Sequence, residues 1–203
     1  MNGRVRVVID FASPASWLAV DPTRALESSL AETFVWLPLR AATIPKPPPA
    51  GSSDDRTTRH RRFRAEYVVQ DLRRYAQARG LELGDVDREV DTTEASMGLL
   101  WLNRSPPSRA GSFVSSVFGR VWQDHAAAGR DFVEDALGEA AGGYRLYAAT
   151  EGPREVAAAR EELIARSVWS TPAYLLEEDL FIGRQHLPMV RWILTGRDGP
   201  PPI

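Results

Sequence analysis

The chain has 203 residues, of which 43% are hydrophobic and 26% are charged, and its formal net charge at pH 7 is −2. These values are typical of one soluble globular domain, or of a domain that carries a large insertion. A negative net charge gives no general attraction to nucleic acid or to an anionic membrane. No apolar run approaches the roughly 20 residues of a membrane helix. Arg4 and Arg6 interrupt the first apolar run, unlike a signal peptide. We therefore expect a cytoplasmic protein that binds neither nucleic acid nor membrane.

The chain contains no cysteine. This excludes disulfides, catalysis by a cysteine thiol of the chain, and cysteine-based metal sites. The three histidines, His60, His125 and His186, are far apart in the sequence and lack the spacing of metal ligands on one helix. We predict no metal site.

The first forty residues predict a βαβ unit. A β-branched run at residues 4–11 predicts a buried strand, and Pro14 directly afterwards predicts a helix to about Leu30. A second apolar run at residues 33–39 predicts another strand. Two strands joined through a helix are expected to be parallel.

Ser13 stands at the predicted junction of strand and helix, and its position has two interpretations. In the first, Ser13 only caps its own helix, because serine is favoured immediately before the first helical residue. In the second, its hydroxyl belongs to an anion site, since a helix N-terminus presents unpaired N–H groups and a partial positive charge. A thiolate is one such anion.

Residues 44–55 are rich in proline and small polar residues, which predicts a loop. The loop follows the end of a parallel strand, the edge at which α/β proteins bind ligands. A loop of this length is typically either disordered or a functional lid.

Residues 57–150 have a helical pattern. One predicted helix ends at Gly80, and a later one runs to Gly129. The residues that mark one face of the first are Phe63, Tyr67, Leu72, Tyr75 and Ala76, and those of the later one are Phe113, Val114, Val117, Phe118, Val121 and Trp122. We interpret the arginines at 59, 61, 62 and 64 as a solvated charged face.

The C-terminal part predicts a ββα unit. After a helix at about 153–166, a strand begins at Pro172, a turn occupies residues 177–179, and a short strand returns over 180–182. A final helix is expected from about Leu187 to Leu194. Strand, tight turn, strand and helix together form this unit.

A βαβ half, an all-helical insertion and a ββα half resemble a thioredoxin fold interrupted by helices. The chain resembles the thioredoxin-like group of 2-hydroxychromene-2-carboxylate isomerases, kappa-class glutathione transferases and DsbA-type oxidoreductases. The resemblance is carried by Asp10-Phe11-Ala12-Ser13-Pro14-Ala15-Ser16, by residues 71–81 and 117–132, by Ser170-Thr171-Pro172-Ala173-Tyr174, and by residues 181–187. It implies an α/β, thioredoxin-like domain from residues 1–56 and 151–203, with residues 57–150 as an inserted helical domain.

The resemblance also assigns a role to Ser13. In DsbA-type members, two cysteines fill the positions of Ser13 and Ser16, so dithiol exchange is excluded here. In the isomerase and transferase branch, the first serine donates a hydrogen bond to the sulfur of bound glutathione. This implies that Ser13 is a catalytic residue that activates a thiol without being the nucleophile. A hydroxyl donor at a helix N-terminus lowers the pKa of a thiol, which agrees with that role.

Further residues are implied in binding the thiol. The family's proline is cis, and the residue before it pairs through its backbone with the glutathione peptide, which here points to Thr171 and Pro172. Arg184 and Gln185 occupy the region where the glutathione-binding members hold the γ-glutamyl end with an aspartate. Gln185 offers no carboxylate, and residues 40–46 lack the family's asparagine. The cofactor is therefore expected to be glutathione or another low-molecular-weight thiol.

Two functions follow. The first is an isomerase- or glutathione-transferase-like enzyme, in which a thiol adds reversibly to an unsaturated aromatic small molecule, the adduct rotates, and the thiol is eliminated. The second is a non-catalytic DsbA-like binding protein that has lost the thiol site. The retained Ser-Pro-x-Ser favours the enzyme, and the changed position 185 favours the binding protein. Related enzymes also suggest a possible homodimer.

Overall fold

The computed structural model describes residues 5–30, 32–41, 55–104 and 109–202. Its sheet has four strands in the order β2-β1-β3-β4. The strands are β1 (Val5–Ile9), β2 (Val35–Pro38), β3 (Ala173–Leu176) and β4 (Asp179–Ile182). β1 and β2 are parallel, while β3 is antiparallel to both β1 and β4. The predicted βαβ and ββα units are confirmed.

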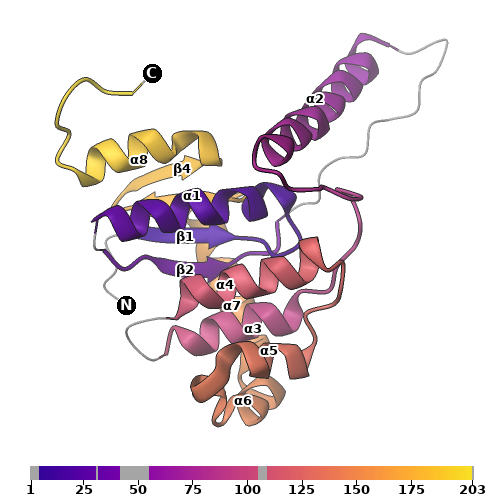
Figure 1. Cartoon of the computed structure of the whole chain (residues 1–203), viewed down its shortest axis with the longest axis vertical. Helices are drawn as coiled ribbons and strands as arrows, with labels where there is room; N and C mark the ends of the chain where they lie inside the picture. The colour runs from indigo at the N-terminus through magenta and orange to yellow at the C-terminus, as the bar shows by residue number, and fades with distance from the viewer. Residues whose placement is uncertain (1–4, 31, 42–54, 105–108, 203) are drawn as a thin grey trace.

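Both faces of the sheet are covered, because successive side chains of a strand point to opposite faces. Val7, Trp36 and Tyr174 lie in the larger core with α1 (Pro14–Leu30) and α8 (Leu187–Leu194). Val8 and Leu175 lie in a smaller core with α7 (Gly152–Ala165). Figure 1 shows α1 and α8 on the near face of the sheet. This explains why β1 has apolar residues at the consecutive positions 7, 8 and 9 rather than an alternating pattern.

The inserted helices share the larger core with the sheet, except α2 (Arg56–Ala78), which packs in a separate small cluster with Leu18. The others are α3 (Thr93–Leu102), α4 (Ala110–Phe118), the π-helix η1 (Gly119–Gln123), α5 (Arg130–Leu137), the 3₁₀ helix η2 (Gly138–Ala141) and α6 (Tyr144–Thr150). Phe118 of α4 packs against Phe11 beyond β1, with ring centroids 5.1 Å apart. Trp122 of η1 stacks on Trp17 of α1 at 6.1 Å. The insertion therefore packs directly against the segment that carries Ser13.

The prediction of a single helix running to Gly129 is wrong. The regular α-helix ends at Phe118, one π-helical turn follows to Gln123, and His125 adopts a φ of 52°. The six predicted apolar residues are all buried, so the face was predicted correctly. The regular helix ends where Gly119, a weak helix former, follows Phe118, and the backbone leaves helical geometry altogether at His125.

The predicted single face of α2 is also wrong. Leu72 and Ala76 are buried, but Phe63, Tyr67 and Tyr75 are 62%, 61% and 48% exposed. The reason is that α2 projects from the body and packs near its C-terminal end, where Leu72 meets Leu18 of α1 (Figure 1). The helix ends as predicted, with Gly80 at a φ of 65°.

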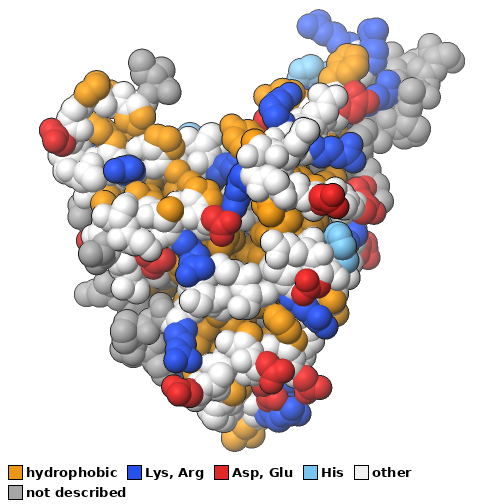
Figure 2. Space-filling model, in the orientation of Figure 1, with side chains coloured by type: hydrophobic (Ala, Val, Ile, Leu, Met, Phe, Trp, Pro, Cys, Tyr) orange, Lys and Arg blue, Asp and Glu red, His pale blue; other side chains and the backbone are white. Residues whose placement is uncertain are grey.

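The projecting end of α2 carries the arginines at 59, 61 and 64, which are exposed, and basic side chains gather there in Figure 2. Asp55 caps this end, because its carboxylate accepts a hydrogen bond from the Thr58 N–H at 2.6 Å. This bond lowers the pKa of Asp55. The remainder of the predicted loop at 44–55 lies outside the described residues. None of the helices in the described ranges is long and apolar enough to span a membrane.

Candidate functional site

Ser13 is the residue immediately before α1, and three hydrogen bonds hold it there. Its N–H donates to the Asp10 carbonyl at 2.9 Å, and its carbonyl accepts from the Trp17 N–H at 3.0 Å. Its hydroxyl oxygen accepts from the Ser16 N–H at 3.3 Å, which is an N-cap interaction. The capping interpretation is therefore confirmed. A hydroxyl that accepts one bond still has its O–H to donate, so capping leaves the thiol-activating role open.

Asp10 forms the base of the site. The residue is only 6% exposed, and its carboxylate accepts hydrogen bonds from the N–H groups of Ala12 and Ala41, both at 2.9 Å. Burial raises the pKa of this carboxyl, against the lowering effects of both hydrogen bonds and of the Arg40 guanidinium. Asp10 thus joins the end of β1 to the chain beyond β2. Asp10 has no role assigned from the sequence alone, although a carboxylate at the end of an apolar strand is a signal that could have identified it.

Ser16, the second serine of the motif, is fully buried. Its hydroxyl oxygen accepts from the backbone N–H of Asp10 at 3.2 Å. The two serines therefore have different places: Ser16 braces the turn from inside, while Ser13 is half-buried at its surface.

The Thr171–Pro172 peptide bond is cis, as predicted. The antiparallel register pairs Val8 with Ala173, and Asp10 and Thr171 each lie two residues beyond this pair in the same direction along the sheet. The cis peptide and the turn that carries Ser13 therefore lie at the same end of the sheet. Thr171 is 7% exposed, and its hydroxyl has no hydrogen-bond partner within the described part of the chain. A buried polar group without a partner is unusual and marks a place where a ligand or water can bind.

Arg184 and Gln185 lie in η3 (Arg184–His186), after Gly183, whose N–H donates to the Pro172 carbonyl at 2.7 Å. The Arg184 guanidinium is directed to α2: it donates to Asp71 at 3.1 Å and lies 3.7 Å from the ring centroid of Tyr75. The exposed side chain of Gln185 turns back, and its amide donates to the Ile182 carbonyl at 3.2 Å. The turn is thus next to the cis proline, while the Arg184 charge is engaged with α2.

Two tryptophans support the Ser13 turn from the helical side. The indole N–H of Trp122 donates to the Phe11 carbonyl at 3.0 Å. The Arg88 guanidinium lies 5.3 Å from the Trp122 ring centroid and donates to the Val121 carbonyl. Trp17 and Trp122 are both buried, so they act as core residues that position the turn.

The resulting site combines a hydroxyl at a helix N-terminus, a buried carboxyl, a cis proline and an unpartnered threonine hydroxyl. Oriented N–H groups and a hydroxyl donor stabilise an anion such as a thiolate. No cluster of three or more metal-ligating side chains is found among the residues that the structure describes.

Comparisons with known proteins agree with this architecture. The model of the DSBA-like thioredoxin domain family matches residues 4–194. No curated protein sequence matches the chain. Among solved structures, a 2-hydroxychromene-2-carboxylate isomerase is 21% identical to this chain and superposes with a TM-score of 0.68. The alignment covers 95% of this chain and 94% of the isomerase chain.

Two further solved structures are similar. A probable DsbA oxidoreductase from Streptomyces coelicolor is 17% identical, with a TM-score of 0.62, 100% of this chain covered and 94% of that one. The cytosolic disulfide reductase DsbM from Pseudomonas aeruginosa, solved with GSH, is 14% identical, with a TM-score of 0.57 and coverages of 96% and 94%. At these identities the likeness shows a common fold, which is the predicted thioredoxin-like α/β fold with a helical insertion. Because the family model spans nearly the whole chain, this protein belongs to the DSBA-like thioredoxin domain family.

Proposed function

We propose that this protein is an isomerase- or glutathione-transferase-like enzyme of the 2-hydroxychromene-2-carboxylate isomerase type, which uses a small thiol activated at Ser13. The observation that carries the proposal is the Ser13 hydroxyl at the N-terminus of α1, at the same end of the sheet as the cis Thr171–Pro172 peptide. The chain has no cysteine, so a DSBA-like domain here must take its sulfur from a bound molecule to perform thiol chemistry.

The solved neighbours support a bound thiol. One neighbour is a 2-hydroxychromene-2-carboxylate isomerase, and DsbM was solved with GSH. We propose glutathione or another low-molecular-weight thiol, paired with the backbone of Thr171 ahead of Pro172. The unpartnered Thr171 hydroxyl is a further group that such a ligand can satisfy. Arg184 and Gln185 are proposed to contact the end of the thiol remote from sulfur.

The proposed reaction conserves atoms and electrons. The thiolate forms a carbon–sulfur bond with a conjugated double bond of the substrate, and the displaced π electrons move onto the carbonyl oxygen as an enolate. The former double bond is now single and rotates. The enolate then restores the double bond, the carbon–sulfur bond breaks, and the thiolate is regenerated. Ser13 donates a hydrogen bond to sulfur at the start and at the end, which favours the thiolate. We propose a small-molecule substrate and a cytoplasmic location, with a homodimer as a possible assembly.

A thermal-shift titration tests thiol binding. We expect glutathione to raise the melting temperature with increasing concentration, since a ligand at 100 times its Kd stabilises a folded protein by about 2.7 kcal/mol. S-methylglutathione is the matched control, because it keeps the peptide but cannot form a thiolate. A flat melting temperature with glutathione and with other small thiols at millimolar concentration contradicts the proposal.

One observation favours the alternative, a non-catalytic DsbA-like binding protein. The Arg184 guanidinium is paired with Asp71 and stacked on Tyr75, and the Gln185 amide is bonded to the Ile182 carbonyl. These contacts orient the Arg184 guanidinium toward α2 and the Gln185 amide toward β4. Because the alternative has lost the thiol site, it predicts that glutathione and other small thiols leave the melting temperature unchanged and that isomerase and transferase assays show no turnover.

A further inference from the structure

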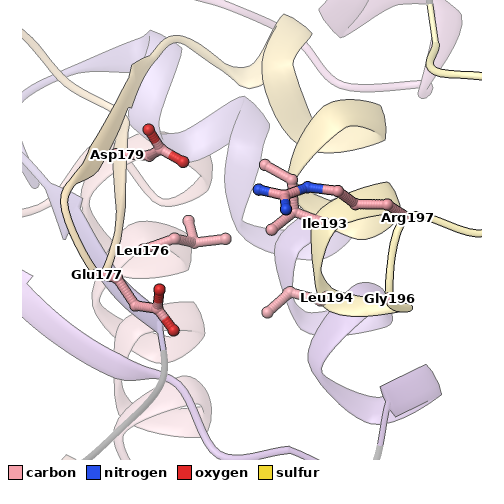
Figure 3. Close-up of a pocket in the computed structure, with 7 residues that line it drawn as sticks. All are labelled: Leu176, Glu177, Asp179, Ile193, Leu194, Gly196 and Arg197. Atoms are coloured by element: carbon pink, nitrogen blue, oxygen red, sulfur yellow. The ribbon is translucent and has the colours of Figure 1, made fainter.

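A separate pocket lies at the opposite end of the sheet from Ser13. β3 begins directly after the cis proline and ends at Leu176. Leu176 pairs with Val5 at the start of β1. The pocket is formed there, between the β3–β4 turn and the C-terminal end of α8, and has a volume of about 240 Å³ (Figure 3). It therefore shares no residue with the candidate thiol site.

The walls of this pocket carry opposite charges. Glu177 and Asp179 lie on the hairpin side, and Arg197 follows α8 on the other side. Figure 3 shows the Arg197 side chain extending across the pocket toward the hairpin. No ion pair or hydrogen bond of these three side chains is found within the described ranges, although they face one common space. The pocket thus offers carboxylates and a guanidinium at separate positions.

The backbone holds two of these charged residues in an unfavourable conformation. Glu177 has a φ of 51° and Arg197 a φ of 63°. Glu177 is the first residue of the two-residue turn between the paired residues Leu176 and Asp179. Glycine adopts such angles without steric cost, whereas a residue with a Cβ does not. Backbone strain of this kind gathers at ligand sites, and here two strained residues present opposite charges to one pocket.

The floor of the pocket is apolar. Leu176 and Leu194 are buried core residues, and Ile193 is half-buried beside them. The volume of about 240 Å³ lies below the usual range for drug-sized ligands, so the pocket suits a small molecule. Such a molecule needs a cationic group for the hairpin carboxylates, an anionic group for Arg197 and a short apolar part for the floor. We propose that this pocket binds a free α-amino acid with an aliphatic side chain.

L-leucine is the probe for this proposal, and its binding is measured from the backbone amide signals of Leu194 and Gly196 in ¹⁵N NMR spectra. L-leucine amide lacks the carboxylate, and 4-methylpentanoate lacks the ammonium group. We expect saturable shifts with L-leucine and at least tenfold weaker binding of either analogue. A peptide N-terminus resembles the amide, so this comparison also separates a free amino acid from a peptide end.

Three variants assign the contacts. Arg197→Gln and Asp179→Asn should each weaken L-leucine binding at least tenfold. Glu178→Gln is the matched control, since Glu178 is exposed in the same turn but does not line the pocket, and it should bind like the parent chain. Absence of saturable shifts up to the solubility limit of leucine overturns the proposal. So does equal binding of leucine amide, or equal binding by Arg197→Gln.

Discussion

The hydroxyl oxygen of Ser13 accepts a hydrogen bond from the N–H of Ser16 across 3.3 Å, which caps α1 while leaving the Ser13 O–H available as a donor. Structural and chemical roles therefore meet in one side chain. They are separable, because the cap depends on the oxygen as an acceptor and the proposed thiol activation depends on the hydroxyl proton.

We predict that Ser13→Ala lowers the free energy of unfolding by about 1 kcal/mol, since the cap is lost, whereas Ser13→Gly lowers it by only a few tenths. Both variants lack the hydroxyl, so both should raise the pKa of a bound thiol. Urea unfolding measures the first effect, and the ultraviolet absorbance of the thiolate during a pH titration measures the second. An unchanged thiol pKa in Ser13→Gly would remove Ser13 from the proposed mechanism.

Asp10 should make the stability depend on pH. Burial raises its folded-state pKa above the usual 3.8, so the folded state holds this proton more tightly than the unfolded state does. The contribution of Asp10 to the free energy of unfolding therefore falls as pH rises from 3.8 through the raised pKa. Asp10→Asn removes this titration. The free energy of unfolding of the variant minus that of the parent chain should be larger at pH 7 than at pH 3, as measured by urea unfolding at both pH values. A stability difference that is independent of pH contradicts the prediction.

Arg184 and Asp71 should couple α2 to the rest of the molecule. Their side chains are 17% and 29% exposed, so the ion pair is partly shielded from solvent. We expect a double-mutant cycle of Arg184→Gln and Asp71→Asn to give a coupling of about 0.5–1 kcal/mol. Amide hydrogen exchange in α2 should become faster in both single variants.

Arg74→Gln is the matched control for that cycle. Arg74 pairs with the same carboxylate at 3.3 Å, but its side chain is 63% exposed. Its removal should change stability by no more than a few tenths of a kcal/mol. Equal effects of Arg74→Gln and Arg184→Gln would show that the contact between α2 and η3 adds nothing.

Tyr174 and Thr23 form a buried hydroxyl pair 2.9 Å apart, between β3 and α1. Burial also raises the pKa of Tyr174 to about 12. Tyr174→Phe should cost about 1–3 kcal/mol, because it leaves the Thr23 hydroxyl buried without a partner. Adding Thr23→Val removes that orphan group, so the double variant should recover part of the loss in thermal or urea unfolding. A double variant that is less stable than Tyr174→Phe refutes this account.

Glu177→Gly should show that the positive φ of Glu177 reduces the stability of the protein. Relief of the positive φ gains about 1–2 kcal/mol, and the added flexibility of glycine costs about 0.5–1 kcal/mol. Glu178→Gly, in the same turn, bears the cost without the gain, because Glu178 does not share the positive φ of Glu177. We expect the first variant to exceed the second by about 1–2 kcal/mol in free energy of unfolding, and only the first to lose leucine binding. Equal stabilities of the two variants would count against strain at Glu177.

The structure also shows where local sequence patterns stop being informative. Apolar periodicity correctly indicated that Leu72 and Ala76 are helical, but it also assigned Phe63 to the same face, and Phe63 is exposed. Periodicity indicates which residues share one face of a helix. Whether that face is buried depends on how much of the helix another element covers. The same limit applies to Arg184, whose partner Asp71 is 113 residues away in the chain.

By itself, the sequence determined the βαβ and ββα units, the absence of dithiol chemistry and, through family resemblance, the cis bond before Pro172, and it offered the cap at Ser13 as one of two interpretations. These features depend on neighbouring residues and on composition, which act locally. Only the tertiary structure decided the burial of Asp10, the engagement of Arg184 with α2, the end of the helix at Gln123 and the charged pocket beside Arg197. Each of these depends on segments far apart in the chain, and their packing is set by the whole core.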